Sequence, residues 1–163
     1  PDDTELGRID GLHGYYDKRS HPEADTPAGL VVYRFSGPLF FANARVFRDQ
    51  VLKLARSDPA PRWIVIAAEP ISDVDTTAAD MLEVLDEALN ARGISLAFAE
   101  MSEIVQEKIK RYELTRTIDP EHFYPTINAA LRAFAAAVDE PDVAPPPDDA
   151  DEAATHHRHR PDR

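Results

Sequence analysis

The sequence predicts an α/β fold in which a mostly parallel β-sheet is covered by helices. Three apolar runs rich in β-branched and aromatic residues have the length of buried strands, at residues 30–35, 63–67 and 94–99. Segments between and after them carry apolar residues every three to four positions, as on one face of a helix. Strands that alternate with helices pair in parallel through helical crossovers, so this order sets the fold class.

Turn and cap residues bound these elements. Asn43 is expected to cap the first helix, and the Asp-Pro-Ala-Pro run at 58–61 ends it. The second helix is predicted over residues 76–92, with Gly93 as its left-handed C-terminal cap. A short helix follows at 102–112, and Thr126 caps the last one. The residues predicted to face inward are Phe47, Val51, Leu54, Ala78, Met81, Leu82, Leu85, Ala88, Leu89, Ile104, Val105, Ile109, Tyr112, Leu131, Phe134 and Val138.

The chain of 163 residues divides into one domain and two polar ends. Residues 1–28 are expected to form a linker with one short strand at 9–15, and residues 29–138 the core. Residues 139–163 hold five prolines, eight acidic residues and a His-Arg cluster, with little apolar bulk. Such a composition cannot bury enough surface to order itself, so this tail is predicted to be disordered.

Composition excludes several classes of function. The chain contains no cysteine, which rules out disulfides, thiolate zinc sites and cysteine nucleophiles. No apolar run approaches the length of a transmembrane helix, so the chain as given is expected to be soluble. Its formal net charge is −12. The one compact basic group, Lys108, Lys110 and Arg111, has the pattern of a solvated helix face, so nucleic acid is not an expected partner.

The loop between the strand at 63–67 and the helix at 76–92 is the best candidate site. It carries Ser72, Asp73 and Asp75, and Thr76 and Thr77 open the helix. Free backbone N–H groups and the positive end of the helix dipole gather at such a helix N-terminus. The loop can therefore hold a phosphate or an anionic partner. The simpler interpretation is that Asp75 is the N-cap, worth about 1 kcal/mol.

Three segments resemble the STAS domain, which is shared by SulP-type anion transporters and by anti-sigma-factor antagonists. They are Arg-Phe-Ser-Gly-Pro-Leu-Phe-Phe-Ala-Asn-Ala at 34–44, Ser-Asp-Val-Asp-Thr-Thr-Ala at 72–78 and Phe-Tyr-Pro-Thr-Ile-Asn-Ala-Ala at 123–130. The first is similar to the strand-to-helix signature of the transporter branch, which the soluble antagonists generally lack. The resemblance covers residues 30–138 and implies a STAS-like small β-sheet with helices packed on it.

For function, the resemblance implies a non-catalytic regulatory or assembly domain of a sulfate-type anion transporter. Such a domain lies on the cytoplasmic side of the cell membrane and contacts the membrane domain of its own transporter or, as a homodimer, a second protomer. The adjacent Phe40 and Phe41 cannot both face one core. One of them is therefore expected to be exposed, either because the loop simply packs against a neighbouring helix or because the ring contacts the membrane domain.

The resemblance also implies two roles for the loop at 72–77. In the antagonist branch the matching hydroxyl is phosphorylated, which makes Thr76 and Thr77 the expected phospho-acceptors of an alternative, soluble phospho-switch. Nucleotide binding has been suggested for STAS domains generally. No cofactor is required, but GTP, GDP or ATP with Mg²⁺ would be expected at Phe40, Phe41, Asn43, Ser72, Asp73, Asp75, Thr76 and Thr77. Alanines at 78–79 replace the usual Gly-Leu, which hinders a close approach of phosphate to the backbone.

A remote alternative is an aspartate-nucleophile phosphatase, because residues 73–77 fit the pattern D-x-D-x-T. One carboxylate would attack phosphorus and the other would act as an acid. Four residues separate the strand from Asp73, however. No later pair of acidic residues is expected where a magnesium site would need it inside the fold, and Asp139 and Glu140 lie outside the predicted core. We therefore do not expect the chain to be an enzyme, and no metal site is predicted.

Overall fold

The computed structural model describes residues 3–112 and 118–138 and contains a six-stranded mixed sheet. The strand order is β2-β1-β3-β4-β5-β6. β3 to β6 are parallel to one another, and β1 pairs antiparallel with both β2 and β3. This confirms the predicted mostly parallel sheet. The strands are β1 (Thr4–Gly7), β2 (Tyr16–Asp17), β3 (Leu30–Arg34), β4 (Trp63–Ala67), β5 (Ser95–Ala99) and β6 (Phe123–Tyr124).

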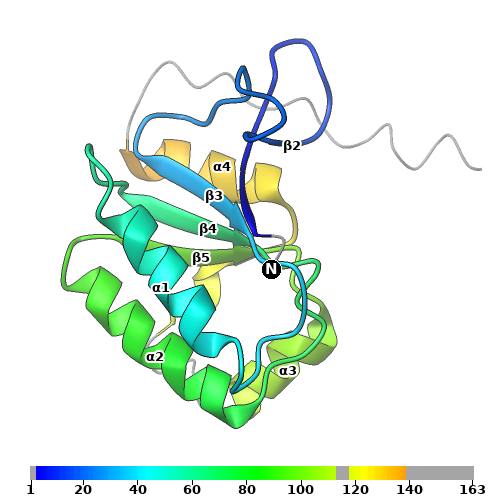
Figure 1. Ribbon diagram of the computed structural model, residues 1–163, viewed down its shortest axis with the longest axis vertical. Coiled ribbons are helices and arrows are strands. Elements are labelled where there is room, and N and C mark those ends of the chain that lie inside the picture. Colours follow the sequence, from blue (N-terminus) through cyan, green and yellow to red (C-terminus); the bar gives the residue numbers. More distant parts are fainter. Residues whose placement is uncertain (1–2, 113–117, 139–163) are drawn as a thin grey trace, which may run out of the picture.

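Helices cover both faces of the sheet, and the three that connect successive parallel strands share one face, as right-handed crossovers made in one direction require. Figure 1 shows the sheet nearly edge-on, with α4 on one side and α1, α2 and α3 on the other. A 3₁₀-helix, η2, lies between α3 and β6. The helices are α1 (Ala44–Ala55), α2 (Thr76–Asn90), α3 (Glu103–Arg111), η2 (Pro120–His122) and α4 (Ile127–Val138).

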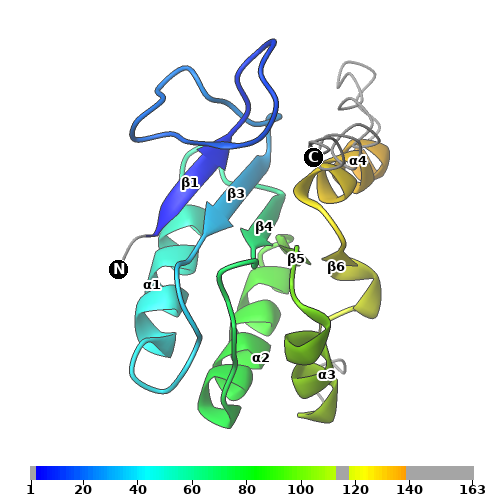
Figure 2. The same ribbon diagram turned by 90° about the vertical axis from the view of Figure 1, so that its right-hand side faces the viewer.

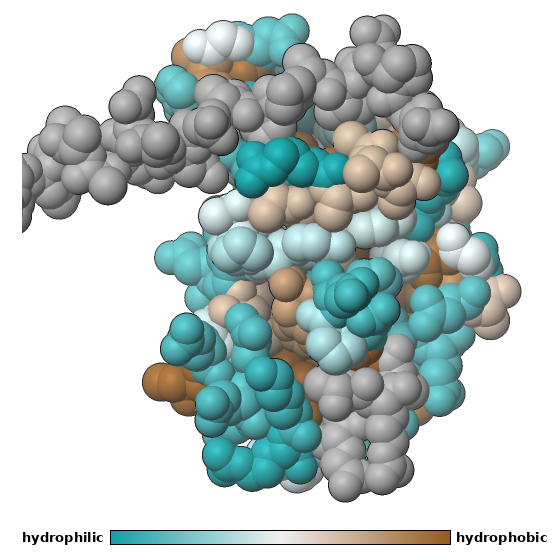
Figure 3. Space-filling view, turned by 180° about the vertical axis from the view of Figure 1, so that it is seen from behind, coloured by the Kyte–Doolittle hydropathy of each residue, from teal (hydrophilic) through white to brown (hydrophobic). Residues whose placement is uncertain are grey.

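Alternate residues of the central strands fill two separate cores. Ile64 and Ile66 of β4 face α1, α2 and α3, whereas Val65 faces α4 with Phe134. Side chains of a strand point alternately to opposite faces, and a strand covered on both sides is therefore apolar at every position. From behind, hydrophilic residues cover much of the surface and apolar ones emerge between them in small areas (Figure 3).

The N-terminal region differs from the prediction. Residues 9–15 form no strand; the strands of this region are β1 before them and β2 after them. The chain turns between the two, where Leu12 N–H donates to the Ile9 carbonyl at 3.1 Å and Gly11 and Gly14 have φ values of 77° and 85°. These glycines are turn residues. The apolar residues near them caused the incorrect prediction of a strand at residues 9–15.

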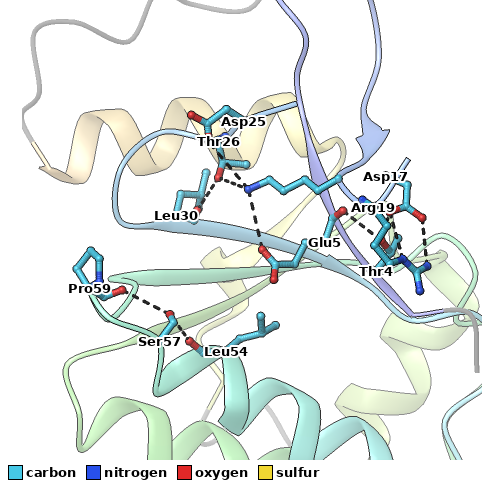
Figure 4. A network of polar contacts seen from close by, with 11 residues as sticks. Thr4, Glu5, Asp17, Arg19, Asp25, Thr26, Leu30, Leu54, Ser57 and Pro59 are labelled. Atoms are coloured by element: carbon cyan, nitrogen blue, oxygen red, sulfur yellow. Dashed lines mark hydrogen bonds and ion pairs between the residues drawn. The ribbon is translucent and has the colours of Figure 1, made fainter. Parts of the chain in front are cut away.

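Residues 4–28 are also more than a linker. β1 lies inside the sheet, and its Leu6 is 4% exposed. Figure 4 shows how polar contacts attach the following loop: Lys18 reaches Glu5 of β1, and the Thr26 hydroxyl donates to the Leu30 carbonyl at 2.8 Å. The predicted boundary at residue 28 therefore falls inside the fold. The predicted tail at 139–163 lies outside the described residues.

The helices lie where they were predicted, and most of the residues predicted to face inward do so. Gly93 has a φ of 72° after α2, and the Thr126 hydroxyl accepts from Ala129 N–H at 3.0 Å at the start of α4. Ile104 is wrong, because it is 75% exposed rather than inward, and Ala88 is exposed as well. Ile104 lies in the first turn of α3, one residue before Val105, so its side chain is rotated by about 100° or more around the helix from the buried Val105 and Ile109. None of the described helices is long and apolar enough to cross a membrane.

Candidate functional site at the carboxyl edge of the sheet

The candidate site lies where the parallel strands end and their helices begin. β3, β4 and β5 lead into α1, α2 and α3, so the three helix N-termini meet at one edge of the sheet, the lower edge in Figure 2. Ligand sites of open α/β sheets are typically found outside this carboxyl edge. The predicted site residues come from two loops, residues 35–43 before α1 and residues 68–75 before α2, and from the first two residues of α2.

Backbone hydrogen bonds join these two loops. Leu39 and Val74 form a parallel β-bridge: Leu39 N–H donates to the Asp73 carbonyl at 2.9 Å, and Asp75 N–H donates to the Leu39 carbonyl at 3.1 Å. Leu39 and Val74 are 1% and 0% exposed. The bridge extends the β3–β4 pairing beyond the strands and brings the predicted residues of both loops to one place.

Asp75 is the N-cap of α2, as predicted. Its Oδ1 accepts from Ala78 N–H at 2.8 Å. Its second carboxylate oxygen, Oδ2, accepts from the Phe41 N–H of the other loop at 2.9 Å. Sequence reasoning missed this second contact, because nothing in a local pattern connects residues 34 positions apart. One carboxylate thus holds both the helix and the neighbouring loop.

Asn43 occupies the N-cap position of α1, but its side chain does not cap that helix. Its Oδ1 accepts from Phe40 N–H at 3.0 Å, and its Nδ2 donates to the Pro38 carbonyl at 2.8 Å. The predicted side-chain cap is therefore wrong. Asn43 instead closes the loop back on itself, the kind of local turn for which asparagine is suited.

Phe40 and Phe41 form an exposed pair at the tip of this loop, which we call the aromatic tip. Phe40 is 38% exposed and Phe41 is 72% exposed. Their rings meet edge to face, with centroids 5.8 Å apart and planes at 82°. That geometry is favourable for aromatic pairs. The prediction that one of the two is exposed is confirmed, and the second is partly exposed as well.

Asp73 is tied to α3. Its Oδ1 accepts from Val74 N–H at 2.9 Å and from the ammonium group of Lys108. The bond from Lys108 holds the pKa of the Asp73 carboxyl below its usual range, and the same bond raises the pKa of Lys108. Lys108 was predicted to belong to a solvated basic face, and it pairs with Asp73 instead. The sequence carries no signal for a partner 35 residues away.

Three further predicted residues are exposed close in sequence to Asp73 and Asp75. They are Ser72, Thr76 and Thr77. Their hydroxyls are accessible to a kinase or a ligand. The start of α2 already holds an anion, however, because Asp75 occupies the Ala78 N–H. A phosphate at this helix N-terminus would approach a like charge. Binding of a nucleotide or an anion to the eight predicted residues therefore stays a prediction.

The geometry does not favour the phosphatase alternative. Both oxygens of Asp75 accept backbone N–H groups, and Asp73 is paired with Lys108. Both oxygens of Asp75 are thus engaged, and the cation beside Asp73 weakens it as a nucleophile. In the part of the chain that the structure describes, no three His, Cys, Asp or Glu side chains are grouped so that they could hold a metal ion.

Comparison with known proteins gives consistent results. A model of the STAS domain family matches residues 21–130. A probable sulfate transporter of Mycobacterium tuberculosis is 38% identical over 135 residues, which are 82% of this chain and 24% of the transporter. The chain thus spans about a quarter of the length of the curated relatives it matches.

Solved structures share the fold. The murine Solute Carrier 26 family member A9 anion transporter, in an inward-facing state, superposes with a TM-score of 0.73 at 21% identity, over 83% of this chain and 22% of the transporter. The anti-sigma factor antagonist SpoIIAA, in its unphosphorylated form, superposes with a TM-score of 0.53 at 15% identity, over 71% of this chain and 95% of that protein. At these identities the likeness concerns the fold alone.

Proposed function

The chain belongs to the STAS domain family, and we propose that it is the regulatory and assembly domain of a sulfate-type anion transporter, on the cytoplasmic side of the membrane. Its similarity to a probable sulfate transporter over 82% of its length supports the transporter branch. Its role there is contact rather than chemistry, since the carboxylates at its candidate site are occupied in holding the fold.

The exposed aromatic tip is the observation that carries this proposal. Leaving a phenylalanine side chain in water forgoes about 1.5–3 kcal/mol of burial free energy, so an isolated domain gains nothing from it. Phe41 is 72% exposed although the loop that presents it is fixed by hydrogen bonds of Phe40, Phe41 and Asn43. Rigidly presented aromatic residues are typical centres of protein interfaces.

The partner we propose for the tip is the membrane domain of the same transporter. Three quarters of the length of the matched transporters lies outside the region that this chain covers, so a large surface of the same polypeptide is available. A pocket on that surface that takes two aromatic rings would bury the tip. Contact with a second STAS domain in a homodimer is the competing arrangement.

Photo-crosslinking tests this proposal. In the full-length transporter, p-benzoylphenylalanine would replace Phe41, a conservative change at an exposed ring. We expect ultraviolet light to join position 41 to a peptide of the membrane domain within the same chain, identified by mass spectrometry. The control carries the label at Leu12, which is 49% exposed on the loop at the opposite edge of the sheet.

The crosslinked peptide decides between the arrangements. A peptide from the membrane domain supports the proposal, and a peptide from residues 3–138 of a second protomer would point to a homodimer. Equal, diffuse labelling from positions 41 and 12 would contradict a specific docking role for the tip. A coding sequence without membrane-spanning segments beside this domain would contradict the transporter assignment itself.

The soluble phospho-switch is the second candidate, favoured by the exposure of Thr76 and Thr77 at the start of α2. A phosphate there adds a charge of roughly −1.5 to −2 close to Asp75. Mass spectrometry of the protein from its native cell tests it: phosphate on either threonine would support this function. Two threonines found consistently unmodified would exclude it.

A further inference from the structure

The contacts of Asp75 point to a role beyond helix capping. We propose that Asp75 is a positioning residue that sets the aromatic tip for docking. This inference rests on the proposed function, in which the tip is the contact with the membrane domain. It concerns how the tip is held rather than what it binds.

Two oxygens of one carboxylate do two separate tasks. Oδ1 accepts from Ala78 N–H at 2.8 Å and caps α2, while Oδ2 accepts from Phe41 N–H at 2.9 Å and fixes the tip. Phe41 is 72% exposed, so packing of its side chain does little to set the position of its backbone. The carboxylate contact is therefore the principal restraint that reaches Phe41 from α2.

The tip is otherwise held by its own loop and by the first residue of α1, because the Phe40 carbonyl accepts from Asn43 N–H at 3.0 Å and from Ala44 N–H at 2.9 Å. Phe40 N–H donates to Asn43 Oδ1 at 3.0 Å, and both residues belong to the same turn. The bridge between Leu39 and Val74 ends one residue before Phe40. Loss of the Asp75 contact would leave both rings attached to the fold through Leu39 and the start of α1. A contact that must order a loose loop on binding is weaker, because that ordering costs conformational entropy.

The two tasks of Asp75 can be separated by Asp75→Ser. Serine is about as good an N-cap as aspartate, and its one hydroxyl oxygen can accept from Ala78 N–H but cannot also reach Phe41. The backbone bonds of residue 75, to the Leu39 carbonyl and from Ala79 N–H, remain. We expect the melting temperature to change by less than about 3 °C.

Hydrogen exchange of the isolated chain, followed residue by residue by NMR, reads the tip directly. In Asp75→Ser we expect the Phe41 amide to exchange about tenfold faster and the Ala78 amide to stay within about twofold. The matched control is Asp80→Ser, which removes the same charge from an exposed position on α2 and breaks none of the contacts of Phe41. An unchanged Phe41 amide in Asp75→Ser would overturn the inference.

The yield of the crosslink from position 41 in the full-length transporter measures docking. We expect Asp75→Ser to lower its yield several-fold and Asp80→Ser to leave it unchanged. A faster Phe41 amide with an undiminished crosslink would refute the positioning role while the proposed function stood. No specific crosslink in the unmutated transporter would refute the proposed function, and with it this inference.

Discussion

Asp86 is a buried carboxylate that, among the residues the structure describes, has no cationic hydrogen-bond partner. It lies on α2, is 2% exposed and accepts from the Asn90 side-chain amide at 3.0 Å. Burial raises the pKa of Asp86 to about 6; the Asn90 bond and the nearby His122 act against this, and Glu87 acts with it. The folded state therefore binds a proton at Asp86 more tightly than the unfolded chain does.

Asp86→Asn is predicted to stabilise the protein at neutral pH. Because the folded-state pKa is above the ordinary value of 3.8, the stability linked to Asp86 is complete below about pH 4 and is lost as pH rises through 6. A shift of about two units corresponds to roughly 2–3 kcal/mol, as an upper estimate. Asparagine keeps an acceptor for Asn90, so urea unfolding should show the gain at pH 8.

The pH dependence is the decisive part of that measurement. The gain in unfolding free energy should be mostly lost near pH 4, where Asp86 is protonated in the folded state and about half protonated in the unfolded chain. Asp80→Asn is the matched control, since Asp80 is exposed on the same helix, and it should change little at either pH. An equal effect of Asp86→Asn at pH 4 and pH 8 would show that its charge does not matter.

At the residue scale, local chemistry was predictable and distant pairing was not. Asp75, Ser102 and Thr126 accept from the N–H three residues ahead, a contact fixed by spacing alone. The second bond of Asp75, to Phe41, and the bond of Asp73 to Lys108 depend on the fold bringing separate segments together. The candidate loop could therefore be located from the sequence, but its partners could not.

At the scale of elements, β3, β4, β5 and the helices were predictable because each is apolar at a regular period. β6 was not, because it has only two residues. β1 was not either, because its sequence Thr-Glu-Leu-Gly is short and mostly polar. Its place in the sheet comes from pairing with β3, in which Leu6 lies opposite Val32. Tertiary pairing, rather than intrinsic propensity, makes this segment a strand.

Leu6→Ala tests whether β1 belongs to the core. Leu6 is 4% exposed and packs in the α4-side core with Leu30 and Val32, so the change should lower the unfolding free energy by about 2–4 kcal/mol. Leu12→Ala is the matched control, because Leu12 is 49% exposed, and it should cost less than about 0.5 kcal/mol. If urea unfolding shows equal losses of free energy for the two variants, residues 1–28 would be a linker, as the sequence predicted.

At the scale of the molecule, the fold gathers its exposed functional groups at one edge. Parallel strands with helices between them place three helix N-termini together, and the bridge between Leu39 and Val74 adds the aromatic tip beside the start of α2. The opposite edge carries the turn between β1 and β2 (Figure 1). A domain built in this way can dock through one end while its sheet and both cores remain unchanged.

Phe41→Ser in the full-length transporter is the functional test of that arrangement. Because Phe41 is 72% exposed, the isolated domain should lose less than about 0.5 kcal/mol of stability. Removing a central aromatic contact typically costs about 2 kcal/mol or more of binding free energy, so uptake of labelled sulfate into proteoliposomes should fall several-fold. Leu12→Ser, an equally polar change at the opposite edge, should transport normally. Normal uptake by Phe41→Ser, at equal protein in the membrane, would mean that transport does not depend on the aromatic tip.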